Sequence, residues 1–274
     1  MMKLREEFSR RAASYDSAAV LAREVGRRMA ERIALVRLAP RRYADIGCAT
    51  GDGLRALQQR FPDALPLALD FARPMLQVVA AQAKWFERLR GRAPRCVNAD
   101  VRALPLAGAS LDLVWSNLML HWLADPRPAF AEIHRTLSDG GLLQFAMLGP
   151  DTLKELRALG APVANFIDMH DIGDMLVAAG FSDPVMEMEM LTLTYATPRG
   201  FLADQRRLGV RAALLGSLGW RQWRKLFAGW QRVDGVLPAR FEIIYGHAWK
   251  VAPRPEKKLA ADGRAIIRFA RSGG

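Results

Sequence analysis

Hydrophobic residues recur along the chain in two alternating patterns, as short apolar runs and as longer stretches with helical spacing. The apolar runs predict five strands, at residues 43–47, 65–70, 95–100, 111–117 and 142–148. The helical spacing predicts intervening helices, at residues 53–61, 73–86 and 125–137. Strands that alternate with helices and are apolar on both faces are typical of a parallel sheet covered on both sides. We therefore expect an α/β fold with a doubly wound, mostly parallel sheet.

Segments on both sides of this core complete the expected fold. Residues 4–37 have helical spacing with a break near residues 14–17, which predicts an N-terminal helical segment within residues 1–40 that covers the site. A helix at 168–181 and strands at 183–195 and 241–251 complete a seven-stranded domain over residues 41–251. Between the last two strands, residues 198–236 predict two or three helices, which we expect to form a basic lid. Residues 252–274 form a tail in which 265–269 predict a short edge strand.

The formal net charge of +12 on the 274-residue chain is concentrated in one segment. Residues 199–232 contain eight basic residues and one acidic residue, a net charge of +7. Such a field attracts polyanions or an acidic protein partner, and a solvated basic face is the ordinary alternative. The chain has no apolar run near the roughly 18 residues of a membrane helix. Its first residues are charged from Lys3 onward, so we expect no secretory signal, and its two cysteines lack metal-ligand spacing. We expect a cytoplasmic protein without a metal ion or a membrane partner.

The stretch YADIGCATGDG at residues 43–53 joins the first strand to a glycine-rich turn. Such turns bind ligands because backbone N–H groups converge there beside the N-terminus of a helix. Asp70 ends the second strand, where a carboxylate accepts both hydroxyls of a ribose. Ala49 stands where the common loop has its middle glycine. The turn therefore predicts a nucleotide-like cofactor, and Ala49 decides which one.

A dinucleotide requires close backbone approach to its pyrophosphate at this position, so a methyl group there is harmful. S-adenosylmethionine has no phosphate and tolerates Ala49 if the φ angle of that residue stays negative. Asp45 suits its ammonium group. Asp100, at the end of the third strand, suits its adenine amino group. Each acid taken alone also suits a helix N-cap, but three acids at the ends of three strands are not explained that way.

These considerations predict an S-adenosylmethionine site at the ends of the first four strands. Val101 is expected to pack on the adenine ring, and Asn117 is expected to lie over the reacting methyl group. The candidate cofactor-binding residues are Asp45, Gly47, Ala49, Gly51, Asp70, Phe71, Met75, Asp100, Val101 and Asn117.

The chain closely resembles the malonyl-acyl-carrier-protein O-methyltransferases of biotin synthesis over about residues 8–251. The similar stretches are FSRRAASYDSAA, LPLALDFARPML, LPLAGASLDLVWSNLMLHWLADP, FAEIHRTLSDGGLLQFAMLGPDTLKEL and ARFEIIYGHAWK. The resemblance implies a class I, Rossmann-like methyltransferase that transfers a methyl group from S-adenosylmethionine to the free carboxylate of a malonyl thioester on acyl carrier protein. Fatty-acid enzymes then elongate the masked chain toward pimelate. The family usually has glycine where this chain has Ala49.

This chemistry agrees with the lack of a convincing general base in the sequence. A carboxylate is already a nucleophile at pH 7, so catalysis consists of positioning and desolvation. Tyr15 is expected to close over the methyl group, and His121 and Trp122 are expected to line the pocket. Packing in the core is the alternative for all three.

The basic insert supplies the expected substrate contacts. Arg206 or Arg207 is expected to hold the malonyl carboxylate, because the guanidinium group binds carboxylates through two hydrogen bonds. Arg221, Arg224 and Lys225 are expected to contact the acidic carrier protein.

Three other functions share parts of this pattern. A complex-I-assembly hydroxylase family keeps the fold and the cofactor loop, but its N-terminal region is less similar. A non-catalytic assembly factor that binds S-adenosylmethionine would have the same cofactor residues. A nucleic-acid methyltransferase would explain the charge, but enzymes that modify base amines have an (N/D)PP(Y/F) stretch where this chain has SNLM. We therefore expect no nucleic-acid partner.

Overall fold

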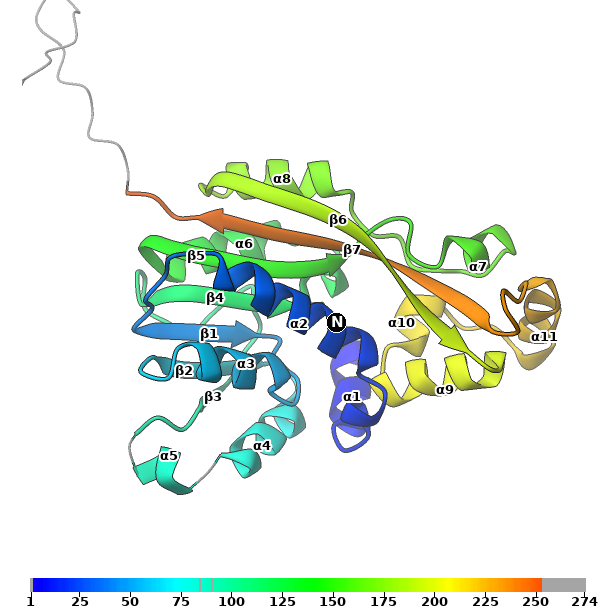
Figure 1. Ribbon diagram of the computed structural model, residues 1–274, viewed down its shortest axis with the longest axis horizontal. Coiled ribbons are helices and arrows are strands. Elements are labelled where there is room, and N and C mark those ends of the chain that lie inside the picture. The colour runs from blue at the N-terminus through cyan, green and yellow to red at the C-terminus, as the bar shows by residue number, and fades with distance from the viewer. Residues whose placement is uncertain (1, 84, 90, 253–274) are drawn as a thin grey trace, which may run out of the picture.

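The structure is a computed structural model that describes residues 2–83, 85–89 and 91–252. Within these residues, seven strands form one sheet in the order β3-β2-β1-β4-β5-β7-β6 (Figure 1). The strands are β1 (Arg42–Ile46), β2 (Leu65–Asp70), β3 (Arg95–Asn98), β4 (Leu111–Asn117), β5 (Leu137–Leu148), β6 (Ser182–Tyr195) and β7 (Leu237–Trp249). Neighbouring strands are parallel except at β7, which is antiparallel to both β5 and β6. The expected seven-stranded, mostly parallel sheet is confirmed.

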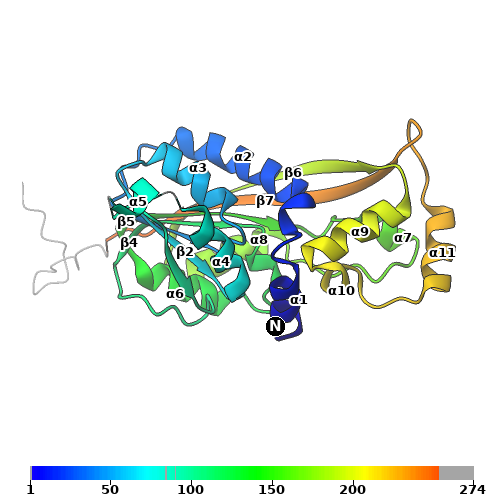
Figure 2. The ribbon, with the colours of Figure 1, turned by 90° about the horizontal axis from the view of Figure 1, so that it is seen from below.

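Helices cover both faces of this sheet (Figure 2). The helices are α1 (Met2–Arg11), α2 (Val20–Ala34), α3 (Asp52–Arg60), α4 (Arg73–Gln82), α5 (Trp85–Leu89), α6 (Arg127–Thr136), α7 (Lys154–Ala158), α8 (Met169–Ala178), α9 (Pro198–Leu208), α10 (Arg211–Leu215) and α11 (Trp220–Gly229), with short 3₁₀ turns η1 (Tyr15–Ser17) and η2 (Leu120–Trp122). Met29 of α2 and Leu54 of α3 pack in the core of one face. Phe130 of α6 and Ile172 of α8 pack in the core of the other. The apolar character of the strands on both faces therefore follows from helices on both faces.

Several element boundaries differ from the predicted ones because strand pairing overrides local spacing. The helix predicted at 125–137 ends at Thr136, and Leu137 begins β5 instead. The segment at 139–141 belongs to this strand, since the Gly140 N–H donates to the Lys250 carbonyl and the Lys250 N–H donates to the Gly141 carbonyl. β7 begins at Leu237, four residues before the predicted strand, because its first residues pair with the end of β6. The helix predicted at 73–86 ends at Gln82.

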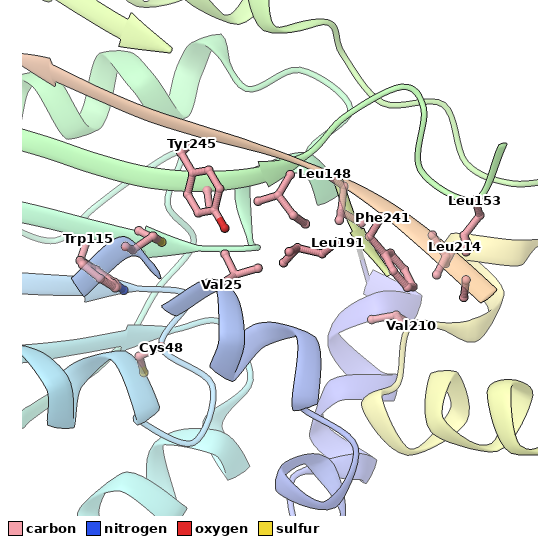
Figure 3. Packing of buried hydrophobic residues seen from close by; sticks show 14 of the residues in the cluster. Val25, Cys48, Trp115, Leu148, Leu153, Leu191, Val210, Leu214, Phe241 and Tyr245 are labelled. Atoms are coloured by element: carbon pink, nitrogen blue, oxygen red, sulfur yellow. The ribbon is translucent and has the colours of Figure 1, made fainter. Parts of the chain in front are cut away.

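β6 and β7 extend beyond the other strands and carry α9, α10 and α11 away from the centre of the sheet (Figure 1). The insert nevertheless shares a core with the sheet. Val210 and Leu214 belong to the same apolar cluster as Phe241, and Leu191 and Val25 continue it toward α2 (Figure 3). The expected helical insertion between the last two strands is confirmed. The edge strand predicted at 265–269 lies outside the described residues.

The helix α2 is fixed on the sheet by polar contacts. Asn117 Nδ2 donates to the Ala22 carbonyl (2.8 Å), and Gln144 Nε2 donates to the Met29 carbonyl (2.9 Å). Arg28 forms an ion pair with Glu189 of β6. The N-terminal segment is therefore fixed at the carboxyl end of the strands, where the site lies. In the described part of the chain, every helix is too short or too polar to cross a bilayer.

Candidate active site

Two adjoining cavities lie at the carboxyl ends of β1, β2 and β4. The first cavity contains about 710 Å³ of free space and the second about 660 Å³, part of each open to solvent. Tyr15, Gly47, Ala49 and Asn117 line both cavities, so the two form neighbouring parts of one site. Ligands of open α/β sheets bind at this edge of the sheet.

The loop after β1 has a left-handed backbone at three positions. The φ angle is +75° at Gly47, +45° at Ala49 and +87° at Gly51. The condition stated above for S-adenosylmethionine, a negative φ angle at Ala49, is therefore not met. The Ala49 N–H donates to Asp70 Oδ2 (3.0 Å), which fixes this turn of the backbone. A residue other than glycine is strained here by about 1–2 kcal/mol.

Asp45 lies in β1 and lines the second cavity. Its side chain is buried, and a Cβ atom at Gly53 would lie only 2.9 Å from its Oδ2 atom. Burial, followed by the charge of Asp70, raises the pKa of Asp45 to about 8. A cation placed beside such a carboxyl group favours its ionised form. Arg23 lines the same cavity, so a carboxyl group and a guanidinium cation are present there together.

Asp70 ends β2 and lines the first cavity. Its Oδ1 atom accepts the Ala72 N–H (2.8 Å) and its Oδ2 atom accepts the Ala49 N–H (3.0 Å). Burial raises its pKa to about 6, and these two amides oppose that rise. Each carboxylate oxygen has more than one lone pair, so Asp70 retains acceptor capacity toward the cavity. It therefore organises the loop and also faces a ligand.

The expected adenine and methyl ends of the site are also in the first cavity, which Asp100, Val101 and Asn117 line. Asp100 pairs with Arg102 (2.6 Å), and this hydrogen bond lowers the pKa of Asp100. The Asn117 amide donates to α2, while its Oδ1 atom is buried without a hydrogen-bond partner among the described residues.

The N-terminal segment forms one wall of the first cavity, through Leu4, Phe8 and Tyr15. The rings of Phe8 and Phe71 meet edge to face with centroids 5.9 Å apart. Burial, followed by the charge of Asp70, raises the pKa of Tyr15 well above its ordinary value, so Tyr15 is a neutral phenol. Thr50 Oγ1 donates to the Asp16 carboxylate, which joins this segment to the cofactor loop.

The predicted lid is in a different place from the one expected. Residues 198–236 contribute no side chain to the lining of either cavity, because the long strands β6 and β7 carry them outward. The helix α9 instead supports the N-terminal segment. Ser14 Oγ lies 3.2 Å from the Arg207 carbonyl, and the Glu7 carbonyl would lie 3.2 Å from a Cβ atom at Gly209.

Several predicted site residues lie outside the cavity walls. Met75 packs in the core with Ala12 and Ala72, and Gly51 shapes the turn into α3. The residues predicted to bind substrate or carrier, Arg206, Arg207, Arg221, Arg224 and Lys225, are exposed on the insert. Arg206 and Arg207 therefore do not hold an acceptor inside the first cavity, and none of its lining residues in the described chain is basic.

Trp122 lines the first cavity, and His121 lies behind it. The His121 ring is 4.5 Å from the Trp122 ring and 5.5 Å from the Phe166 ring, between centroids. Burial lowers the pKa of His121 to about 3, so its imidazole is neutral at physiological pH. It is therefore not a cationic anchor.

Sequence reasoning missed Arg23, Leu4 and Phe8 as parts of the site. Leu4 and Phe8 are one helical turn apart on α1, so helical periodicity placed these two on one face of that helix. Arg23 has no comparable signal, because only the packing of α2 brings it into the lining of the second cavity.

The residues of the two cavities fit S-adenosylmethionine. Asp45 and Arg23 match the opposite charges of an amino-acid end, and Asp70 retains acceptor capacity for ribose hydroxyls. The apolar part of the first cavity, with Val101, Leu104 and Leu123, suits an adenine ring. Within the described residues, no group of three His, Cys, Asp or Glu side chains is arranged to hold a metal ion.

Comparisons with known proteins show which family and which fold this chain resembles. Residues 44–145 match the model of a family described as a methyltransferase domain. Malonyl-[acyl-carrier protein] O-methyltransferase of Gallionella capsiferriformans is 47% identical over 97% of this chain and 94% of its own length. The enzyme of the same name from Laribacter hongkongensis is 48% identical over 97% and 95%. The YcgJ protein of Bacillus subtilis has a similar fold, with a TM-score of 0.60 and 15% identity, over 82% of this chain and 98% of its own.

Proposed function

This chain belongs to the malonyl-[acyl-carrier protein] O-methyltransferase family, and from that membership we propose that it methylates the free carboxylate of malonyl-acyl-carrier protein with S-adenosylmethionine. The observation that carries the proposal is the grouping of Asp45 and Arg23 beside Asp70 in one site at the carboxyl edge of the sheet. The product is a methyl ester whose charge is masked, which suits the early part of pimelate and biotin synthesis in the cytoplasm.

The chain's own residues hold the cofactor in this proposal. Arg23 binds the α-carboxylate of the amino-acid end and Asp45 binds its ammonium group. Asp70 accepts the ribose hydroxyls, and Asp100 accepts the adenine amino group while Val101 packs on the ring. When bound, S-adenosylmethionine supplies an electrophilic methyl group on a sulfonium centre.

The acceptor needs positioning and exclusion of water rather than proton transfer. A malonyl carboxylate is ionised at neutral pH, so its oxygen is nucleophilic without a general base. Leu4, Phe8 and Trp122 provide apolar walls that exclude water around that oxygen. The neutral Tyr15 phenol is able to donate a hydrogen bond without taking a proton from the acceptor.

The basic insert is the proposed docking surface for acyl carrier protein. In α11, Trp223 is buried while Arg221, Arg224 and Lys225 are exposed. The insert adjoins the N-terminal segment through α9, and α11 lies at its outer end (Figure 2). An acidic carrier is attracted by this charge during association.

The proposed function is tested by incubating the purified chain with S-adenosylmethionine and malonyl-acyl-carrier protein. We expect two products, S-adenosylhomocysteine and a methyl ester. The methyl ester is heavier than the substrate by one CH₂ group, because a methyl group replaces the carboxyl hydrogen. Acetyl-acyl-carrier protein, which lacks the free carboxylate, is the matched control and should give neither product. Equal S-adenosylhomocysteine formation with both carriers, or none with either, would refute the proposal.

The same assay separates the alternatives. A hydroxylase of the same fold incorporates oxygen without forming the malonyl methyl ester. A non-catalytic assembly factor binds S-adenosylmethionine in calorimetry but forms no S-adenosylhomocysteine. Only the methyl ester, identified by mass, supports the proposed function.

A further inference from the structure

Trp115 and Asp45 are direct neighbours on two paired strands beside the cofactor loop. In the parallel register, Asp45 of β1 is the partner of Trp115 of β4. Side chains of such partners project from the same face of the sheet. Trp115 is fully buried there, in the core cluster that contains Leu54 and Leu57 of α3 (Figure 3). The indole ring therefore packs beside the carboxyl group that we assign to the ammonium group of the cofactor.

Gly53, in the first turn of α3, shows how close the two polar groups are. An added Cβ atom at Gly53 would lie 2.7 Å from Trp115 Nε1 and 2.9 Å from Asp45 Oδ2. Nε1 and Oδ2 are thus at most about 5.6 Å apart, the sum of those two distances. Since residue 53 has no side chain, the space that the two atoms share stays open to them.

Trp115 Nε1 is a buried donor without a hydrogen-bond partner among the described residues. An indole N–H donates and never accepts, so it needs an acceptor nearby. Buried donors are rarely left unpaired in proteins, because an unmade hydrogen bond is costly. The neighbouring carboxyl group of Asp45 is an acceptor whose strength increases when it ionises.

The surroundings of Asp45 oppose its ionisation in the ligand-free protein. Burial, followed by the charge of Asp70 on β2, raises its pKa to about 8, and the charge of Asp52 on α3 acts in the same direction. A hydrogen bond from the Leu54 backbone lowers the pKa but does not offset this rise. The other titratable side chains that line the cavity with Asp45 are Tyr15, Asp16, Arg23, Cys48 and Arg55. A further donor aimed at the carboxylate would favour the charged form that an ammonium group requires.

We infer that Trp115 donates its indole N–H to the Asp45 carboxylate when that group ionises, and so prepares Asp45 to bind the ammonium group of S-adenosylmethionine. The inference rests on the proposed function and adds a positioning residue to it. Trp115 lines neither cavity, so it acts on the cofactor only through Asp45. Its effect should therefore depend on whether Asp45 is ionised before the cofactor binds.

The test compares the wild type with Trp115→Phe, which lacks the donor and stays apolar. The probe is S-adenosylhomocysteine, which has the same amino-acid end as the cofactor and no reactive methyl group, and its affinity is measured by calorimetry at two pH values. At pH 7 we expect the variant to bind about tenfold more weakly, the size of a lost hydrogen bond to a charged group. At pH 9 the difference should fall to about twofold, because Asp45 is by then largely ionised in the wild type and about half ionised in the variant. A mere packing defect would lower the affinity equally at both pH values.

Two further proteins separate the N–H group from the shape of the ring. Benzothienylalanine in place of Trp115 keeps the fused ring and replaces its N–H by sulfur, so it should show the same pH-dependent loss. This protein decides the matter if Trp115→Phe does not fold. Trp223→Phe is the matched control, because Trp223 is also buried with an unpartnered Nε1 atom but lies on α11, far from Asp45 (Figure 1). It should bind S-adenosylhomocysteine within about twofold of the wild type at both pH values.

Three results would overturn the inference: full affinity at pH 7 without the N–H group, a loss of equal size at pH 7 and pH 9, or the same pH-dependent loss in Trp223→Phe. Adding Trp115→Phe to Asp45→Asn should give no pH-dependent loss, because no ionisable group remains at residue 45. Such a loss in the double variant would also overturn the inference. Failure of the methyl-ester assay together with the pH-dependent loss refutes the proposed function alone. An active wild type with an unaffected Trp115→Phe variant refutes this inference alone.

Discussion

The strained residue Ala49 gives a prediction about stability. Its φ angle of +45° is costly for alanine and easy for glycine, while glycine loses more entropy on folding. We expect Ala49→Gly to raise the free energy of unfolding by up to about 1 kcal/mol and to bind S-adenosylmethionine at least as tightly. Thermal unfolding and calorimetry measure both. The control is Ala80→Gly, on the exposed face of α4. It should lower the free energy of unfolding by about 1 kcal/mol. A destabilised Ala49→Gly variant would contradict this account of the loop.

The raised pKa of Asp45 predicts that stability and cofactor binding both depend on pH. Its pKa is raised to about 8, so the ligand-free protein holds a proton at pH 7 that an unfolded chain has released. Its contribution to the free energy of unfolding therefore decreases as pH rises from about 4 to about 8. A bound ammonium group favours the carboxylate, so binding should release up to about one proton at pH 7.

Calorimetry in two buffers with different enthalpies of ionisation measures this proton release. Asp45→Asn is the control, because it removes the titrating group and nearly keeps its shape. The wild type should release more protons than this variant on binding S-adenosylmethionine. Equal release would mean that Asp45 does not contact the ammonium group.

At the scale of elements, the N-terminal segment depends on α9 for its position. Gly209 ends α9 with φ +81°, and a Cβ atom there would press on the backbone of Glu7 and Phe8 at 3.2–3.3 Å. We expect Gly209→Ala to displace α1, with faster hydrogen exchange over residues 2–17 and weaker cofactor binding. Gly235→Ala is the matched control, because Gly235 has φ +79° and no atom within 4 Å of the added methyl group. The Gly235→Ala variant should have the strain of an alanine at positive φ, but hydrogen exchange in α1 should be no faster than in the wild type.

At the scale of the whole molecule, the exposed basic side chains of the insert lie apart from the cavities in which we propose that the methyl transfer occurs. Reversing Arg221, Arg224 and Lys225 to Glu should raise KM for malonyl-acyl-carrier protein severalfold at low salt. Turnover of a carrier-free malonyl thioester should barely change, because these exposed side chains line neither cavity. The effect should shrink as salt increases, since screening weakens electrostatic attraction.

The control for this charge reversal is a second triple variant with the same change in charge. Arg37, Arg41 and Arg42 are exposed near the start of β1, at the opposite edge of the sheet from the cavities. Their reversal to Glu should leave KM for the carrier substrate nearly unchanged. Equal effects of the two triple variants would mean that net charge, rather than a docking surface on α11, attracts the carrier.

The sequence by itself determined the elements, the sheet and the acids at the strand ends. Alternation of apolar runs with helical spacing is a local property, so β1, β2 and the helices between the strands were predictable. Asp45, Asp70 and Asp100 were identified because parallel strands end at one edge, whatever the details of packing. The cavities lined by these three acids are where the sequence predicts them.

Tertiary structure decided what depends on contacts between distant segments. The Ala49 N–H donates to Asp70, twenty-one residues away, and this hydrogen bond fixes the turn in which Ala49 has a positive φ angle. The insert fails to cover the cavity because pairing extends β6 and β7 beyond the sheet, and α1 takes its place. The tautomer of His121 depends on the backbone of Leu148, and Arg23 lines the same cavity as Asp45 only through the packing of α2. Periodicity along one segment carries no information about which distant partner it meets, and the chemistry of these side chains is set by those partners.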